Sequence, residues 1–189
     1  FSMISAGMVP INVATSTEVV SSQILSLSGS LLAVLLMLVL IFHSFYRGVM
    51  GMIPLAFTVL FNFGIMGYSG VNLDIGTALV SSIVIGIGVD YSIHYLSRMF
   101  SEITQGADLQ DAIASTVRRS GKAITSNAVT VGFGFLALGV SEFLPLVTLS
   151  WMIWLTLNIS ALATMILLPA LAVTMPNVLK LGPSGNKKY

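Results

Sequence analysis

The sequence contains no cysteine and very few charged residues. Charged side chains make up only 8% of the 189 residues, whereas soluble domains carry about 25%. The lack of cysteine excludes disulfides and thiolate metal sites, and the low charge argues against a water-soluble globular domain. Hydrophobic residues account for 56% of the chain, enough for several membrane-spanning helices of about 20 residues each. The sequence therefore indicates an all-α membrane protein.

Five apolar segments are long enough to cross a bilayer as helices. We expect residues 16–175 to form a bundle of five transmembrane helices. Ser16 or Thr17 is a candidate cap for a helix that leads into the first span. The expected spans are about 28–46, 49–68, 75–95, 123–140 and 146–168.

The two ends of the chain differ in composition from the spans. Residues 1–15 mix small, β-branched and polar residues, and we expect them to be the end of an extracytoplasmic porter domain. Residues 176–189 contain Gly, Pro, Ser and Lys, as is typical of a frayed tail. Because the chain begins with Phe1 and not with Met, we expect it to be a piece of a longer protein.

The distribution of charge predicts the orientation in the membrane. With five alternating spans, all eight Lys and Arg residues fall on one side, whereas Glu18, Asp74 and Glu142 fall on the other. The positive-inside rule then places the N-terminus outside and the C-terminus in the cytoplasm. We expect a multi-pass protein of the inner, cytoplasmic membrane.

The segment between the third and fourth spans contains a candidate amphipathic helix. Gly106 breaks the chain and Asp108 can cap a helix over about 108–120. Leu109, Ile113 and Val117 recur at intervals of four residues, on one helical face. This pattern predicts a cytoplasmic helix that lies along the membrane surface. A linker helix packed on protein is the alternative.

Asp90 is the one acidic residue inside an expected span. A carboxylate in hydrocarbon costs at least about 2.5–3.5 kcal/mol on insertion scales, so intramembrane acids mark ion pathways. On a helix, Asp90 shares a face with Ser82, Gly86 and His94, at intervals of four. We expect the small residues here, together with Gly88, to let a neighbouring helix pack closely, so that the acid points into the bundle.

The residues after Asp90 continue the polar stretch. Tyr91 follows directly, and His94 lies one helical turn on. Asp90 could load and release a proton, with Tyr91 orienting it and His94 as a relay partner. In the alternative interpretation Asp90 is neutral and hydrogen-bonds a neighbouring helix, Tyr91 only packs, and His94 is an ordinary interfacial imidazole.

The fourth span offers a second face of polar and small residues. Asn127 and Thr130 are neighbours at i, i+3, and Gly134 follows Thr130 by four. We expect this face to pack on the Asp90 face, with Asn127 and Thr130 as relay partners and Gly134 at a close contact. Interhelical hydrogen bonding without transport chemistry is the alternative.

The sequence lacks the residues that other classes of functional site require. Gly86-x-Gly88 lacks the third glycine and the strand context of a nucleotide loop. An aspartyl intramembrane protease needs two facing carboxylates, and the spans contain one. Two histidines without cysteine or clustered carboxylates predict no metal site. We therefore expect no enzyme activity, no cofactor, no metal and no nucleic-acid partner.

The stretch from Gly86 to Phe143 resembles a known superfamily. It reads GIGVDYSIHYLSRMFSEITQGADLQDAIASTVRRSGKAITSNAVTVGFGFLALGVSEF. Its Gly-x-Gly-x-Asp-Tyr core, the amphipathic segment and Ser-Gly-Lys-Ala-Ile are similar to the resistance–nodulation–division (RND) superfamily. The likeness is to the MMPL-type and predicted-exporter branch, which is related to the sterol-sensing Patched-like proteins, and it covers residues 17–176.

The resemblance implies an organisation in two homologous halves, each with one span, a porter domain and five more spans. This chain would supply the last five spans of the C-terminal half. Its partners would be the missing N-terminal half, the porter domains, membrane lipids and protons, with a homo-oligomer left open. Asp90 and Tyr91 match the Asp-Tyr pair of the family's proton relay, whereas the Lys and Arg partners of the multidrug branch have no counterpart in these spans.

The function implied by the resemblance is export of lipids or other hydrophobic compounds, driven by the proton-motive force through proton antiport. The alternative is a sterol-sensing-type module that binds lipid and regulates a partner without transport. The two hypotheses differ in whether Asp90 must change its charge.

Overall fold

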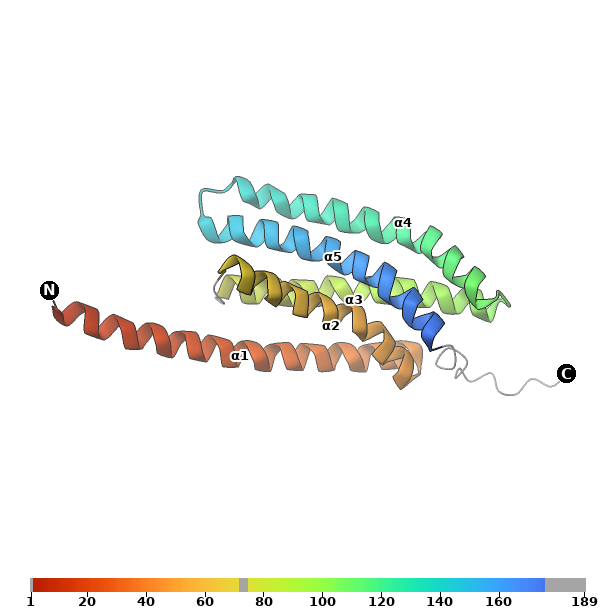
Figure 1. Cartoon of the computed structure of the whole chain (residues 1–189), viewed down its shortest axis with the longest axis horizontal. Coiled ribbons are helices and arrows are strands. Elements are labelled where there is room, and N and C mark those ends of the chain that lie inside the picture. The colour runs from red at the N-terminus through yellow and green to blue at the C-terminus, as the bar shows by residue number, and fades with distance from the viewer. Residues whose placement is uncertain (1, 72–74, 176–189) are drawn as a thin grey trace.

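The computed structural model describes residues 2–71 and 75–175, and every regular element within them is a helix. Side chains are described for residues 21–71, 77 and 80–175. The helices are α1 (Ser2–Phe42), α2 (Phe45–Ser69), α3 (Ile75–Thr104), α4 (Leu109–Leu136) and α5 (Leu144–Thr174), with a short 3-10 helix η1 (Ala137–Val140) before α5 (Figure 1). The all-α prediction is confirmed.

Successive helices run in opposite directions through one bundle (Figure 1). α2, α3 and α5 pack on one another at its centre. α1 packs on α2 and α3 at one edge, and α4 packs on α3 and α5 at the other. The N-terminal part of α1 extends past the ends of the other helices (Figure 1). α3 is therefore in contact with every other long helix.

Four of the described segments are long and apolar enough to cross a membrane: Ser21–Phe42, Phe45–Ser69, Leu109–Val140 and Leu144–Thr174. α3 is not among them, because several residues of its apolar N-terminal part lie outside the described side chains. However, α3 connects the end of α2 at one end of the bundle with the start of α4 at the other (Figure 1). It must cross the same layer, so we treat it as the fifth spanning helix of a multi-pass membrane protein.

The first helix begins earlier than expected. α1 starts at Ser2 and passes without a break through the predicted cap positions Ser16 and Thr17. Serine and threonine favour caps, but they are also tolerated inside a helix, so a cap signal alone does not fix a helix start. The side chains of residues 1–20 and the whole of 176–189 lie outside the described residues, and the predictions for them remain untested.

The predicted cytoplasmic helix and the fourth span form one helix. Asp108 occupies the N-cap position of α4, after Gly106 at a φ of 94°. α4 then continues past Ser120 and through Gly121 to Leu136. Glycine is disfavoured inside a helix because of its conformational freedom. Here Gly121 packs against the Met165 side chain of α5, where a larger residue would not fit without a shift of that side chain.

The amphipathic face of α4 rests on protein. Ala112 and Thr116 are fully buried. Leu109, Ile113 and Val117 pack against the largest buried cluster of the bundle. The expected helix on the membrane surface is therefore replaced by the packed alternative, because the apolar face of α4 finds a partner within the chain.

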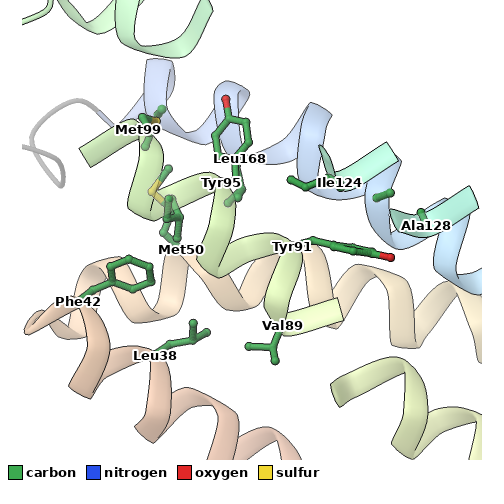
Figure 2. Close-up of a cluster of buried hydrophobic side chains, with 13 residues drawn as sticks. Leu38, Phe42, Met50, Val89, Tyr91, Tyr95, Met99, Ile124, Ala128 and Leu168 are labelled. Carbon is green, nitrogen blue, oxygen red and sulfur yellow. The ribbon is translucent and has the colours of Figure 1, made fainter. Parts of the chain in front are cut away.

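The largest buried cluster joins all five long helices (Figure 2). It includes Leu38 and Phe42 of α1, Met50 of α2, Ile124 and Ala128 of α4, and Leu168 of α5. Val89, Tyr91, Tyr95 and Met99 of α3 lie among them. This cluster fixes the half of α3 that begins at Asp90.

Candidate functional site

Asp90 opens into a pocket between α3 and α4. The pocket has a volume of about 310 Å³. Three of its lining residues come from α3 and four from α4: Asp90, Tyr91 and His94, and Ser120, Ala123, Ile124 and Asn127. The structure thus brings together four of the side chains expected to act on a proton, namely Asp90, Tyr91, His94 and Asn127.

The side chains in the pocket differ in exposure. Asp90, His94 and Asn127 are exposed, whereas Tyr91 is 1% exposed. Within the described residues no side chain hydrogen-bonds to Asp90 or forms an ion pair with it. The pocket therefore presents an acid and an imidazole at its open side, and a phenol at its inner wall.

Tyr91 lies between Asp90 and α4. Its side chain interacts with the Asn127 amide and with the charge of Asp90, and its ring points toward Ala128 of α4 (Figure 2). The Tyr91 hydroxyl does not meet hydrogen-bond geometry with any described residue, so Asn127 is a neighbour at interaction range and not a formed hydrogen-bond partner.

The predicted face of Ser82, Gly86, Asp90 and His94 does lie on one side of α3, but that side is exposed. A Cβ built on Gly86 would meet no atom within 4 Å. The expectation that this face packs on a neighbouring helix, with the acid pointing into the bundle, is therefore wrong for the described chain. The small residues of this face permit a close helix contact but do not require one.

Gly88 and Gly132 lie at close helix contacts in the described chain. A Cβ on Gly88 would lie 3.0 Å from both Leu55 of α2 and Ser160 of α5. On α4, Gly134 has no neighbour within 4 Å, whereas a Cβ on Gly132 would lie 2.9 Å from Trp154. Gly88 is thus a close-packing residue, as expected, and Gly132 takes the role assigned to Gly134.

Thr130 does not join the pocket. It is exposed and is absent from the residues that line the cavity. Ser120, Ala123 and Ile124 were not predicted, although with Asn127 they repeat at the three- and four-residue spacing of one helical face. This shared face was not recognised because one predicted helix ended at Ser120 and the next began at Ala123.

The basic residues with described side chains gather toward one end of the bundle. Arg47 begins α2, Arg98 ends α3, and Arg118, Arg119 and Lys122 lie in the first half of α4. Glu142 lies at the opposite end, between η1 and α5. The basic end holds the α1–α2 and α3–α4 connections, and His94 and Ser120 lie on its side of the pocket.

Comparison with known sequences identifies the family. The sequence profile of the MMPL family matches residues 6–187. The chain belongs to the MMPL family. This MMPL chain is similar to the membrane protein MJ1562 of Methanocaldococcus jannaschii, with 28% identity over 171 residues that make up 90% of this chain and 44% of that protein.

Two mycobacterial relatives of this MMPL chain are named as exporters. The Mycobacterium tuberculosis protein named sulfolipid-1 exporter MmpL8 is 32% identical over 94 residues, 50% of this chain and 9% of that protein. The Mycobacterium leprae protein named "Probable trehalose monomycolate exporter MmpL3" is 32% identical over 105 residues, 55% of this chain and 11% of that protein. The chain thus spans less than half the length of these relatives, and no solved structure matches it.

Proposed function

We propose that this chain is the membrane part of a proton-driven exporter of lipids or other hydrophobic compounds, and that Asp90 is the group that binds the proton. The observation that carries the proposal is the position of Asp90, an acid in a spanning helix that opens into a pocket shared with Asn127, Tyr91 and His94. An acid at this depth is costly, and a pocket with polar walls gives water and protons access to it.

The proposed mechanism uses the charge of Asp90 as a switch between two packings of α3 and α4. A carboxylate favours an open, hydrated pocket and attracts the Asn127 amide, which can donate hydrogen bonds to it. A neutral carboxyl no longer needs those donors, so α3 and α4 can close on each other. Proton binding from one side and release to the other would then drive the two states in turn.

The proposed orientation in the membrane rests on the distribution of charge. The basic end of the bundle is proposed to face the cytoplasm, as the positive-inside rule requires.

The exposed α3 face of Ser82, Gly86, Asp90 and His94 cannot stay in contact with lipid at low cost. We propose that the missing N-terminal half of the protein covers this face, and that the porter domains pass the substrate on.

The substrate class is proposed from the named relatives. A sulfolipid and a trehalose monomycolate are the compounds in those names. Lipids are the class that a membrane-embedded exporter can collect from the bilayer itself. The particular lipid would be selected by the porter domains, outside this chain.

The test is Asp90→Asn in the intact protein, reconstituted into phosphatidylethanolamine and phosphatidylglycerol liposomes. An acid pH step outside the liposomes drives proton entry, which an internal pH dye reports, and a fluorescent acylated trehalose reports lipid movement. Asn keeps the size of Asp but cannot take up the proton. We expect proton flux and lipid transport to fall by at least about 100-fold, the lower end of what a positioned proton-transfer group contributes.

Asp111→Asn is the matched control, since Asp111 is an exposed acid in the first turn of α4, away from the pocket. It should leave both signals unchanged. If Asp90→Asn transports lipid at the wild-type rate, the exporter proposal is wrong, and a lipid-binding regulatory module of the sterol-sensing type becomes the better account.

A further inference from the structure

Five buried hydroxyl groups lie in the half of the bundle that follows Asp90, and none has a hydrogen-bond partner among the described residues. We call them the inner hydroxyls: Tyr91, Ser92 and Tyr95 of α3, Thr116 of α4 and Thr164 of α5. Each residue is at most 1% exposed. A buried hydroxyl without a partner destabilises a fold, so five in one region call for an explanation.

Helix association does not explain the inner hydroxyls. A hydroxyl that joins two helices needs a partner across the interface, and the same bundle contains such a case. The Thr156 hydroxyl of α5 donates to Asn62 Oδ1 of α2 at 3.1 Å and to its own helix at Met152 O at 2.7 Å. The inner hydroxyls form neither kind of bond among the described residues, although the Tyr91 phenol lies at interaction range of the Asn127 amide of α4. Phenylalanine, alanine or valine would fill the same space.

The first of the inner hydroxyls is in contact with the Asp90 pocket. Tyr91 lines the pocket and is buried at the same time. Tyr95 lies one turn further along α3, and its ring extends toward α5 near Leu168, whereas the Tyr91 ring extends toward α4 (Figure 2). The two phenols thus lead from the pocket wall into the interior of the bundle.

Ser92 and Thr164 lie beside this position. α3 and α5 run in the same direction, and Gly88 packs against Ser160. Ser92 and Thr164 each follow that contact by four residues, so one turn further along both helices places their hydroxyls in the same interface.

Thr116 lies closer to the basic end of the bundle. Its neighbour Ser115 donates a hydrogen bond to Glu102 Oε1 of α3 at 3.1 Å, and Glu102 pairs with Arg98 at 2.7 Å. Glu102 follows Asp90 by twelve residues, which is about 18 Å along a helix. The residues that carry the inner hydroxyls therefore extend along the bundle from the pocket to the level of this ion pair, where Thr116 follows Ser115 in α4.

We propose that the inner hydroxyls, with water molecules between them, form an internal route for the proton between Asp90 and the basic end of the bundle. The inference rests on the proposed function of Asp90. Each hydroxyl can accept one hydrogen bond while it donates another. A proton leaving the Asp90 carboxyl is taken up by the adjacent water, each hydroxyl gives its proton onward as it receives one, and every hydroxyl ends unchanged.

The experiment measures proton flux through the intact protein in the liposomes described above, as a function of the imposed proton concentration. Tyr95→Phe removes one oxygen and keeps the ring. We expect the maximal flux to fall about five- to tenfold, the effect of one lost hydrogen bond. The proton concentration at half-maximal flux, which Asp90 sets, should not change. Tyr46→Phe, at an exposed tyrosine of α2, should match the wild type in both quantities.

Thr116→Val repeats the flux measurement at a second position, and it tests the route if Tyr95→Phe does not fold. An unchanged maximal flux in the folded variant would overturn the route while leaving the exporter proposal intact, provided that Asp90→Asn is inactive. A shift of the half-maximal concentration would also overturn it, since the hydroxyl would then act on Asp90 itself. If Asp90→Asn conducts protons normally, the exporter proposal and this route both fail.

Discussion

Single glycines decide how close the helices of this bundle approach. Gly88 packs against side chains of two other helices, whereas Gly86, two residues earlier, meets nothing within 4 Å in the described chain. The two residues differ by about 200° around α3. One faces the core of the chain, and the other lies on the exposed face with Asp90.

This difference gives a matched pair of substitutions. Gly88→Val places methyl groups where Leu55 and Ser160 already lie, and overpacking of this kind typically costs about 1–3 kcal/mol. Gly86→Val makes the same change in helix propensity where no atom lies within 4 Å, so the difference between the variants isolates packing. Thermal unfolding of the intact protein in detergent should show Gly88→Val melting well below Gly86→Val. Equal melting temperatures would contradict the packing of Gly88.

The sequence predicted which residues share a face of α3 but not which face is buried. The spacing of Ser82, Gly86, Asp90 and His94 follows from helix geometry alone. In a soluble helix the polar face would be the exposed one, whereas in a membrane both lipid and helix neighbours are apolar. The choice between Gly86 and Gly88 therefore required the positions of Leu55 and Ser160, which lie far away in the sequence.

At the scale of the helices, the corner between α1 and α2 is fixed to the end of α3. Phe42 packs edge-on against Phe100 with ring centroids 5.7 Å apart, and the Arg47 guanidinium lies 4.3 Å from the same ring centroid. Gly48 lies directly against Val39 at this corner. The helix that carries Asp90 is thus attached to the two helices that precede it.

A double-mutant cycle measures this attachment. We expect Arg47→Gln and Phe100→Leu to couple by about 0.5–2 kcal/mol in the free energy of unfolding, because the cation–π contact exists only when both residues are present. Tyr46→Phe combined with Phe100→Leu is the control, and these two substitutions should add independently. Full additivity of Arg47→Gln with Phe100→Leu would mean that the contact contributes nothing.

Helix existence was easier to predict than helix limits. Long apolar runs predicted α2 and α5, and Asp108 marked the start of α4. The join between the amphipathic segment and the fourth span was not predicted, and Gly121, a residue of low helix propensity, lies at this join. The contact with Met165 of α5 accompanies a glycine at this position. Of the residues that line the pocket from α4, Asn127 was predicted, whereas Ser120, Ala123 and Ile124 beside this join were not.

At the scale of the whole molecule, the five helices alternate in direction, so successive connections lie at opposite ends of the bundle. The described basic residues lie toward one end, and Glu142 lies at the other. α3, with 30 residues, is about 45 Å long at about 1.5 Å per residue, and so exceeds the hydrocarbon layer of about 30 Å. Its last turns, with Arg98 and Glu102, extend beyond that layer.

The lack of native cysteine makes this topology directly testable. Single cysteines at Gln110 and Glu142 can be labelled with a membrane-impermeant maleimide, in an intact protein whose other cysteines, if any, are replaced. Both positions are exposed and lie at opposite ends of the bundle. We expect Glu142→Cys to react in intact cells and Gln110→Cys only after the cells are opened. Reaction of both positions in intact cells would contradict the orientation.

The proposed pump depends on Asp90 gaining and losing a proton within the membrane. The most direct measurement is infrared difference spectroscopy of the reconstituted intact protein during acidification, which detects the carbonyl stretch of a carboxyl group as it becomes protonated. We expect Asp90→Asn to remove one such band, and Asp111→Asn to leave that band in place. An identical set of bands in the wild type and Asp90→Asn would show that Asp90 does not take up the proton, and the proposed pump would have no proton-binding group.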